Sequence, residues 1–128
     1  LFLTKSSTNS GNHSIERTGL PIPASRLDDV ECPHDGALLW MDIEGYEGHA
    51  LRGAPNLLAA GIPVVCEYNT GYLENSGGMN WFREALAGRR IFDLKQGVQP
   101  VEITLDKLTV MYPAGSAFTD ILAIKNRG

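Results

Sequence analysis

The segment ALLWMDIEG, residues 37–45, constrains the fold of this chain more than any other. Five apolar residues lead into Asp42, and Glu44 and Gly45 follow within three positions. A carboxylate inside an apolar strand is costly unless it is paired, hydrogen-bonded or hydrated. We therefore expect a strand that is covered on both faces and that brings its two acids out at its carboxyl end, where Gly45 opens a turn.

Helical and extended patterns alternate after this strand. From Glu47 the apolar residues recur at helical spacing, Pro55 is placed to begin a second helical piece, and Gly61 is placed to end it. Further strands are predicted at 62–68, 90–94 and 118–125, a helix at 79–89, and a polar loop at 69–78. Residues 101–112 combine helical spacing with β-branched residues, and we favour a helix there.

Strands that alternate with helices are typical of β-α-β units, so we expect an α/β fold with a mainly parallel sheet and helices on both faces. At 128 residues the chain is long enough for one domain with its own core. We divide this single domain, residues 1–128, into a loop-rich lead-in (1–36) and a β/α core (37–128). The lead-in is predicted to hold a strand at 1–4 and a loop at 5–14. Because the chain starts with Leu, inside that strand, we expect it to be a piece of something longer.

Composition and charge argue against several classes of function. A net charge of -4, with scattered Lys and Arg, argues against nucleic-acid binding, which needs a basic face. No apolar run approaches the ~20 residues that cross a bilayer, and no signal peptide opens the chain, so we expect no membrane partner. Cys32 and Cys66 lack metal-binding and redox spacing, and we expect buried free thiols in a reducing, cytoplasmic compartment.

The acids of the first apolar strand have a counterpart on the next one. Asp42 and Glu44 share a strand face, and Glu67 ends the second apolar strand in the same way. If the two strands are neighbours, ~4.8 Å apart, the three carboxylates gather at the rim where α/β sheets bind their ligands. Mutual repulsion there raises at least one pKa, which suits a general base near neutral pH. Oxygen ligands for a divalent cation are the other interpretation of this cluster.

Structural roles compete with functional ones at several polar residues. Glu47 lies where an acid stabilises a helix N-terminus, and we favour that structural role. His49 is expected to pack against a helix or lie at the surface, and His34 to be solvated in a turn. The loop around Asn12 and His13 is crowded with hydrogen-bonding groups, so a substrate contact and a plain turn are equally good interpretations.

The stretch LLWMDIEGYEGHALRGAPNLLAAGIPVVCEY (38–68) resembles the FkbM-type methyltransferases. These carry an IDVEGxE…VLxGA…LL…P…E pattern across a strand, a helix and the next strand of a class I methyltransferase fold. A weaker likeness over NSGNHSI (9–15), LPIPASRLDDV (20–30) and FTDILAIK (118–125) extends it to nearly the whole chain. The resemblance implies a Rossmann-like sheet and methyl transfer from S-adenosylmethionine to a hydroxyl oxygen of a sugar, polyketide or other natural product.

The resemblance also assigns roles to individual residues. Asp42, Glu44 and Glu67 match the family's strand-end acids, and we predict that they are catalytic, orienting or deprotonating the acceptor hydroxyl. Asp42 and Gly45 are the predicted cofactor contacts. The predicted substrate contacts are Asn12, His13, Tyr68 and Asn69, and no metal ligand is predicted.

One departure from the family pattern is large. Class I methyltransferases hold the cofactor largely on a Gly-rich turn after the first strand and on an acid that ends the second, and nothing before residue 37 has that pattern. The chain therefore resembles the carboxyl-terminal part of the domain, with its first strands missing. We expect it to bind S-adenosylmethionine weakly or not at all, and to be inactive alone. The same loss leaves the acidic strand with an unpaired edge, which predicts self-association.

Two other functions remain open. A partial domain of this kind can serve as a non-catalytic interaction or assembly module, and titration with S-adenosylhomocysteine separates that function from the enzymatic one. A metal-assisted hydrolase or transferase, with Mg²⁺ or Mn²⁺ on Asp42, Glu44 and Glu67, is less favoured because no histidine has a suitable spacing.

Overall fold

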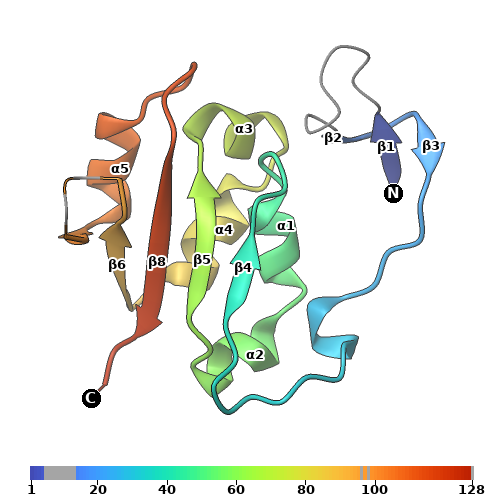
Figure 1. The fold of residues 1–128 in the computed structure, drawn as a ribbon. Helices are drawn as coiled ribbons and strands as arrows, with labels where there is room; N and C mark the ends of the chain where they lie inside the picture. Colours follow the sequence, from blue (N-terminus) through green and yellow to red (C-terminus); the bar gives the residue numbers. More distant parts are fainter. Residues whose placement is uncertain (5–13, 96, 98, 128) are drawn as a thin grey trace.

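The structure, a computed structural model, describes residues 1–4, 14–95, 97 and 99–127 (Figure 1). The strands are β1 (Phe2–Thr4), β2 (Ser14–Glu16), β3 (Leu20–Pro21), β4 (Leu39–Met41), β5 (Val64–Tyr68), β6 (Arg89–Asp93), β7 (Val101–Ile103) and β8 (Thr119–Lys125). The helices are α1 (Glu47–Arg52), α2 (Pro55–Ala60), α3 (Thr70–Asn75), α4 (Met79–Leu86) and α5 (Leu105–Met111), with a 3-10 turn, η1, at Leu27–Asp29. A small sheet has the order β2-β1-β3, and a large one has the order β4-β5-β8-β6-β7.

The large sheet is mixed rather than mainly parallel, so that part of the predicted fold class is wrong. Among the described strands, only β4 and β5 pair in parallel, and β8 lies antiparallel between β5 and β6. The prediction assumed a crossover helix between successive strands. Residues 94–100, which join β6 to β7, are too few for a crossover, and the two strands pair antiparallel.

The described helices pack on one face of the large sheet, so the expectation of helices on both faces is also wrong. Figure 1 shows α1, α2 and α4 behind the sheet. In β5, Val64, Cys66 and Tyr68 are buried on the helix side, whereas Val65 and Glu67 are half-buried on the other. On the open face Trp40 is 72% exposed. The sequence suggested two covered faces because apolar residues occupy both of them.

Close contacts between backbones hold the helical layer together. A Cβ atom at Gly48, in α1, would lie 2.0 Å from the carbonyl oxygen of Gly78, which precedes α4. Glycine at position 48 is therefore required for α1 to approach α4. Phe82 and Leu86 of α4 then reach the core, where Phe82 packs against Tyr68 with ring centroids 5.8 Å apart.

Most predicted elements after residue 36 are present. Pro55 separates α1 from α2, and Gly61 ends α2 with a φ of 89°, as the sequence indicates. The predicted loop over 69–78 is wrong for its first part, which forms α3. Residues 101–112 hold a short strand followed by the favoured helix.

The lead-in and the cysteines follow the predictions in part. The strand predicted at 1–4 is present as β1, and most of the predicted loop, residues 5–13, lies outside the described part of the chain. Both cysteines are free thiols, and Cys66 is buried as expected, but Cys32 is exposed. Burial raises the pKa of the Cys66 thiol, which keeps it protonated and unreactive.

None of the described helices is long and apolar enough to cross a membrane.

Candidate functional site

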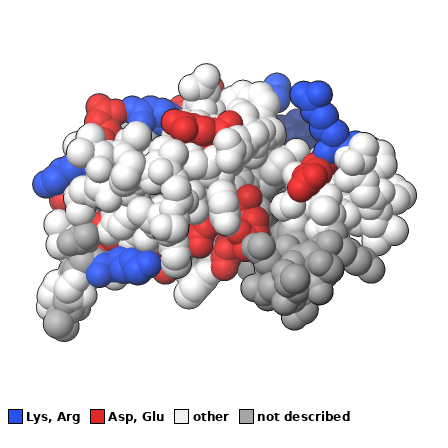
Figure 2. All heavy atoms as spheres, turned by 90° about the horizontal axis from the view of Figure 1, so that it is seen from above, with Lys and Arg blue, Asp and Glu red and all other residues white. Residues whose placement is uncertain are grey.

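Carboxylates from three neighbouring strands meet at the carboxyl end of β4 and β5. Glu67, in β5, lies directly opposite Asp120 of the antiparallel strand β8. Met41, which ends β4, pairs with Cys66, so the next residue, Asp42, follows beside Glu67. Figure 2, which looks down on this end of the molecule, shows acidic side chains gathered near its centre. The structure thus brings Asp42 and Glu67 to one rim, as the sequence predicts.

The electrostatics of this acidic rim (Asp42, Glu44, Glu67 and Asp120) make Glu67 the most perturbed carboxyl group. Partial burial and the charges of Asp42, Glu44, Glu47 and Asp120, in that order, raise the pKa of Glu67 to about 7. Burial and the charge of Asp42 also raise the pKa of Glu44. A half-buried carboxyl group that titrates near neutral pH can both take up and release a proton under ordinary conditions.

Asp120 is the member of the acidic rim that sequence reasoning missed. It stands at the start of the last strand, and its position opposite Glu67 follows only from the antiparallel direction of β8. A strand that ran parallel would have placed it at the other end of the sheet. Nothing in the local residue pattern sets that direction.

The turn after β4 holds Glu44 in an uncommon backbone conformation. Glu44 has a φ of 55° and Gly45 a φ of 90°, and the N–H of Tyr46 donates to the carbonyl oxygen of Ile43 at 3.2 Å. Positive φ at a residue other than glycine costs free energy and clusters at functional sites. A Cβ atom at Gly45 would lie 2.6 Å from the Tyr72 backbone, so this glycine allows the turn to pack on α3. Its predicted contact with the cofactor remains a prediction.

Two polar residues of α1 are occupied by structural contacts. Glu47 is buried, and its Oε1 accepts from the N–H of Ile43 at 3.0 Å, while burial raises its pKa. Glu47 therefore makes a structural contact with the turn before α1, and its predicted effect on the helix N-terminus stays a prediction. His49 stacks on Tyr46 with ring centroids 4.0 Å apart, and its Nε2 lies 2.8 Å from the carbonyl oxygen of Ser76. The packing role expected for His49 is confirmed.

Two of the predicted substrate contacts, Tyr68 and Asn69, are buried and bonded to other parts of the chain. Tyr68 is fully buried, and its hydroxyl lies 2.8 Å from Oγ1 of Thr109, so it faces the helical layer and not the rim. Asn69 is also buried, and its Oδ1 caps α3 by accepting from the N–H of Tyr72 at 3.1 Å. We therefore do not carry either residue into the proposed site.

The remaining candidates are the other two predicted substrate contacts and His34. Residues 12 and 13, the other two predicted substrate contacts, lie outside the described part of the chain. His34 is exposed, as its predicted solvated turn requires. Among the described residues, no three His, Cys, Asp or Glu side chains converge in a way that would hold a metal ion. The metal-assisted alternative therefore gains no support from the geometry.

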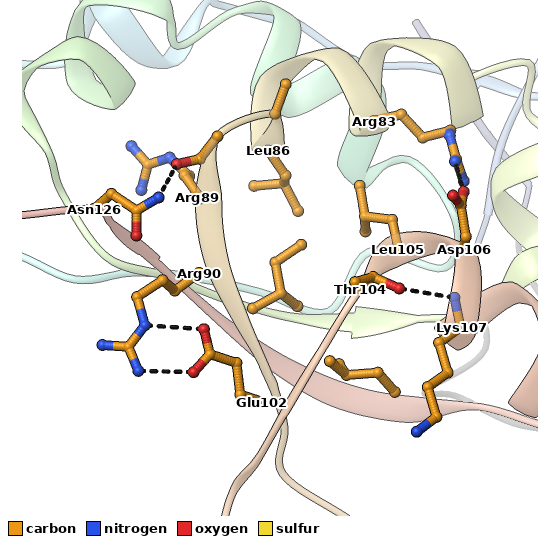
Figure 3. A pocket seen from close by; sticks show the side chains of 14 residues that line it. Arg83, Leu86, Arg89, Arg90, Glu102, Thr104, Leu105, Asp106, Lys107 and Asn126 are labelled. Atoms are coloured by element: carbon orange, nitrogen blue, oxygen red, sulfur yellow. Dashed lines mark hydrogen bonds and ion pairs between the residues drawn. The ribbon is translucent and has the colours of Figure 1, made fainter.

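A hollow at the opposite end of the sheet is lined by residues of α4, β6, β7 and α5 (Figure 3). Its arginine side chains are already bound to other groups of the chain. Arg90 donates two hydrogen bonds to Glu102, at 2.9 and 2.8 Å, and Arg83 pairs with Asp106. Arg89 donates to two backbone carbonyl oxygens of the α2–β5 segment. Because these three guanidinium groups already have partners within the chain, the hollow is a weaker candidate site than the acidic rim.

Comparison with known families shows to which family the chain belongs. A family model described as Methyltransferase FkbM domain matches residues 1–124. The chain belongs to the FkbM methyltransferase family. No curated protein and no solved structure gives a significant match. The family implies a Rossmann-like fold and S-adenosylmethionine as the methyl donor, and the parallel pair β4–β5 with α1 and α2 between the strands agrees with such a fold.

The described part of the FkbM domain shows no Gly-rich turn for the cofactor before β4. Before β4 it holds three short antiparallel strands and the turn η1, and no strand, Gly-rich turn and helix follow one another there. β4, which carries the acids to the rim, is an edge strand of the large sheet. The described residues thus supply an acidic rim without the cradle for the nucleoside that the resemblance leads us to expect.

Proposed function

We propose that this FkbM domain contributes to O-methylation of a hydroxyl group, with S-adenosylmethionine supplying the methyl group and Glu67 acting on the acceptor. The observation that carries this proposal is the position of Glu67 between Asp42 and Asp120, at the carboxyl end of the parallel strand pair. Ligands of open α/β sheets bind at this end. An acceptor hydroxyl that donates to Glu67 gives its proton to a carboxylate whose pKa of about 7 suits that transfer.

The neighbouring acids have different parts in this proposal. Asp42 orients the acceptor hydroxyl by accepting a hydrogen bond, and Glu44 forms the wall of the site on the α3 side. Holding the oxygen in a fixed direction supplies much of the acceleration that positioning gives to a bimolecular transfer. The chain's own residues thus bind the acceptor, orient it and take up its proton.

A methyl-transfer assay tests this function. Radiolabelled S-adenosylmethionine and a panel of hydroxylated acceptors are supplied to the chain and to the longest polypeptide that its gene encodes. Where methylation occurs, Glu67→Gln is expected to reduce the rate by about 100-fold or more, because a general base contributes ~10²–10⁴-fold. Glu74→Gln, at an exposed residue of α3, is the matched control and should leave the rate unchanged. Full activity in Glu67→Gln would refute the assigned role.

We also propose that this chain alone binds the cofactor weakly or not at all. Support comes from the short antiparallel strands that precede β4 in place of a Gly-rich turn. Calorimetric titration with S-adenosylhomocysteine is expected to give no heat of binding at micromolar concentrations. Micromolar affinity would show that other residues of the chain form the cradle.

A second candidate function is an interaction or assembly module. The observation in its favour is the open face of the large sheet, where Trp40 lies 72% exposed on the edge strand β4. Exposed apolar edge strands recruit other strands. This function needs no cofactor, and it predicts self-association at micromolar concentrations without any activity.

A further inference from the structure

Two cavities meet beside the acidic rim, between the lead-in and the helical layer. The first, about 410 Å³, lies between β2, the turn after β4, and α3; the second, about 620 Å³, lies between the lead-in and α1. Ile15 and Tyr46 line both cavities, so they form a shared wall. Each volume lies within the range of small-molecule sites, ~300–1,000 Å³.

The first cavity, here called the head cavity, has the more polar lining of the two. Glu16, Glu44 and Asn75 line it together with the ring of Tyr72, which is 40% exposed. None of the described residues that line it is Lys or Arg. Carboxylate and amide groups accept hydrogen bonds from hydroxyls, and an exposed tyrosine ring packs against the C–H face of a saturated ring. The same carboxylates repel an anionic ligand.

The second cavity, here called the tail cavity, is mainly apolar. Leu27, Ile43 and Ala50 line it, with the ring of His49, whose Nε2 already lies within hydrogen-bond distance of the Ser76 carbonyl oxygen. Burying a methylene group contributes roughly 0.8 kcal/mol, so a cavity of this kind favours an aliphatic chain over a polar group.

The Tyr46 side of the wall between the cavities is held in place by hydrogen bonds to the neighbouring turn. The hydroxyl of Ser76 donates to the carbonyl oxygen of Gly45 at 2.7 Å and accepts from the N–H of Gly78 at 3.1 Å. The turn that carries Glu44 and Tyr46 is thereby tied to the end of α3, so this side of the head cavity is in place before a ligand arrives. A preformed cavity loses less free energy to ordering on binding.

We propose that the paired cavities bind an amphipathic acceptor, with an uncharged hydroxylated ring in the head cavity and an aliphatic chain in the tail cavity. This inference rests on the proposed function, because Glu44 both lines the head cavity and interacts electrostatically with Glu67. Among the described residues that line the head cavity, Glu44 is the one that belongs to the acidic rim. The acceptor class is therefore a glycolipid-like or similarly substituted alcohol, and not a phosphorylated or carboxylated sugar.

Three probes test the inference by titration into ¹⁵N-labelled protein, observed by NMR. They are methyl β-D-glucoside (head alone), n-octyl β-D-glucoside (head and tail) and n-octyl β-D-glucuronide (tail with an anionic head), each below the concentration at which it forms micelles. The octyl glucoside is expected to bind at least about tenfold more tightly than the methyl glucoside, because several methylene groups become buried. It should shift amides near both cavities, at Gly45 and Tyr72 and also at Ala50. The glucuronide should bind more weakly than the octyl glucoside.

Two variants locate the binding. Tyr72→Ala is expected to weaken both glucosides, whereas Ala50→Phe fills the tail cavity and should remove only the advantage of the octyl chain. Val110→Ala, at a residue 79% exposed on α5, is the matched control. Equal affinity of the two glucosides, stronger binding of the glucuronide, or shifts remote from both cavities would overturn the inference. If Ala50→Phe does not fold, the three probes on the unaltered chain still decide.

These measurements contain no methyl donor, so they are independent of catalysis. Binding of the octyl glucoside without any methyl transfer would leave the cavity assignment standing and refute the proposed function. Methyl transfer to acceptors that lack an aliphatic chain, together with no preference among the probes, would support the proposed function and refute the cavity assignment.

Discussion

Glu67 of β5 and Asp120 of β8 lie directly opposite each other on neighbouring antiparallel strands. Like charges directly opposite in a sheet are destabilising, and Asp42 adds a third carboxylate on the β4 side. A sheet that is built only for stability gains nothing from this arrangement. The acidic rim therefore lowers the stability of the fold at the place where we put the chemistry, as expected of functional sites.

The first prediction concerns the pH dependence of stability. The pKa of Glu67 is raised from 4.5 to about 7 on folding, so between these values the folded state binds more protons than the unfolded state. The contribution of Glu67 to the free energy of unfolding is then fully present below about pH 4.5 and is lost as the pH rises through about 7. Glu67→Gln should be more stable than the wild type at pH 8, by about 1 kcal/mol once solvent screening of this half-buried group is allowed for.

Urea unfolding of both proteins at pH 4 and pH 8 measures this difference. Glu74→Gln, at an exposed position of α3, is the control and should show the same pH dependence as the wild type. A Glu67→Gln variant that is less stable than the wild type at pH 8 would show that the carboxylate has a stabilising partner.

The second prediction concerns the cause of that perturbation. Asp120→Asn keeps the size of the side chain and removes one of the charges that raise the pKa of Glu67. The pKa of Glu67 should therefore fall toward its ordinary value, as followed by the ¹³C chemical shift of its carboxyl carbon. Asp106→Asn, on α5 beside the hollow at the opposite end of the sheet, is the control. Burial is the largest cause of the raised pKa, and an unchanged pKa in Asp120→Asn would show that Asp120 adds nothing to it beside Asp42, Glu44 and Glu47.

The third prediction concerns the approach of α1 to α4. Glycine to alanine within a helix normally stabilises it by ~1 kcal/mol. At Gly48 the added Cβ atom would lie 2.0 Å from the carbonyl oxygen of Gly78, so Gly48→Ala should destabilise the fold by roughly 2–3 kcal/mol, as overpacking does. Thermal unfolding measures the change. Ala59→Gly, at an exposed position of α2, is the comparison and should lose only the intrinsic helix preference.

The sequence predicts correctly the turns and helix ends that depend on one residue and its immediate neighbours. The acids before Gly45, the break at Pro55 and the cap at Gly61 each follow from one residue type and its immediate neighbours. The direction of β8, and with it the position of Asp120, depends on how distant strands pair, which no short pattern encodes. Helix α3 was missed because its N-terminus relies on the side chain of Asn69, which in an isolated sequence also favours a turn.

The uncovered face of the large sheet is a second feature that the sequence pattern does not predict. Apolar residues on both faces of a strand indicate that both faces avoid water, but they do not say what covers them. Trp40 is apolar enough to be buried, and the described part of the chain leaves it largely exposed. The sequence thus predicted correctly that this strand has two apolar faces and wrongly that helices of the same chain cover both.

The fourth prediction concerns self-association through that face. The backbone edge of β4 has no strand partner on its outer side within the described chain, and Trp40 adds exposed apolar surface beside it. We expect concentration-dependent association at tens of micromolar, measured by light scattering, and Trp40→Ser should shift the equilibrium toward monomer. Val110→Ser removes a similarly exposed apolar residue on α5 and should not. A wild-type chain that stays monomeric throughout would remove the support for an assembly module.

The fifth prediction concerns a helix cap that comes from a distant part of the chain. Helix α2 begins with Pro55, which has no N–H to donate, and the preceding Ala54 has no side chain that can cap the helix. The two carboxylate oxygens of Asp28, in η1, accept instead from the N–H groups of Asn56 and Leu57, at 3.0 and 3.1 Å. Asp28 thus ties the lead-in to the core and complements the partial positive charge at the helix N-terminus.

Asp28→Ala should therefore lower the free energy of unfolding by about 1–2 kcal/mol, the usual range for loss of an N-terminal cap. Asp28→Asn keeps one oxygen acceptor and should lose less. Asp29→Ala, at the exposed neighbouring residue, should change little. Urea unfolding ranks the three variants, and amide exchange adds a local test: exchange at Asn56 and Leu57 should quicken in Asp28→Ala and not in Asp29→Ala. Equal stability of the two alanine variants would mean that the η1 segment does not hold α2, and that the lead-in contributes little to the core.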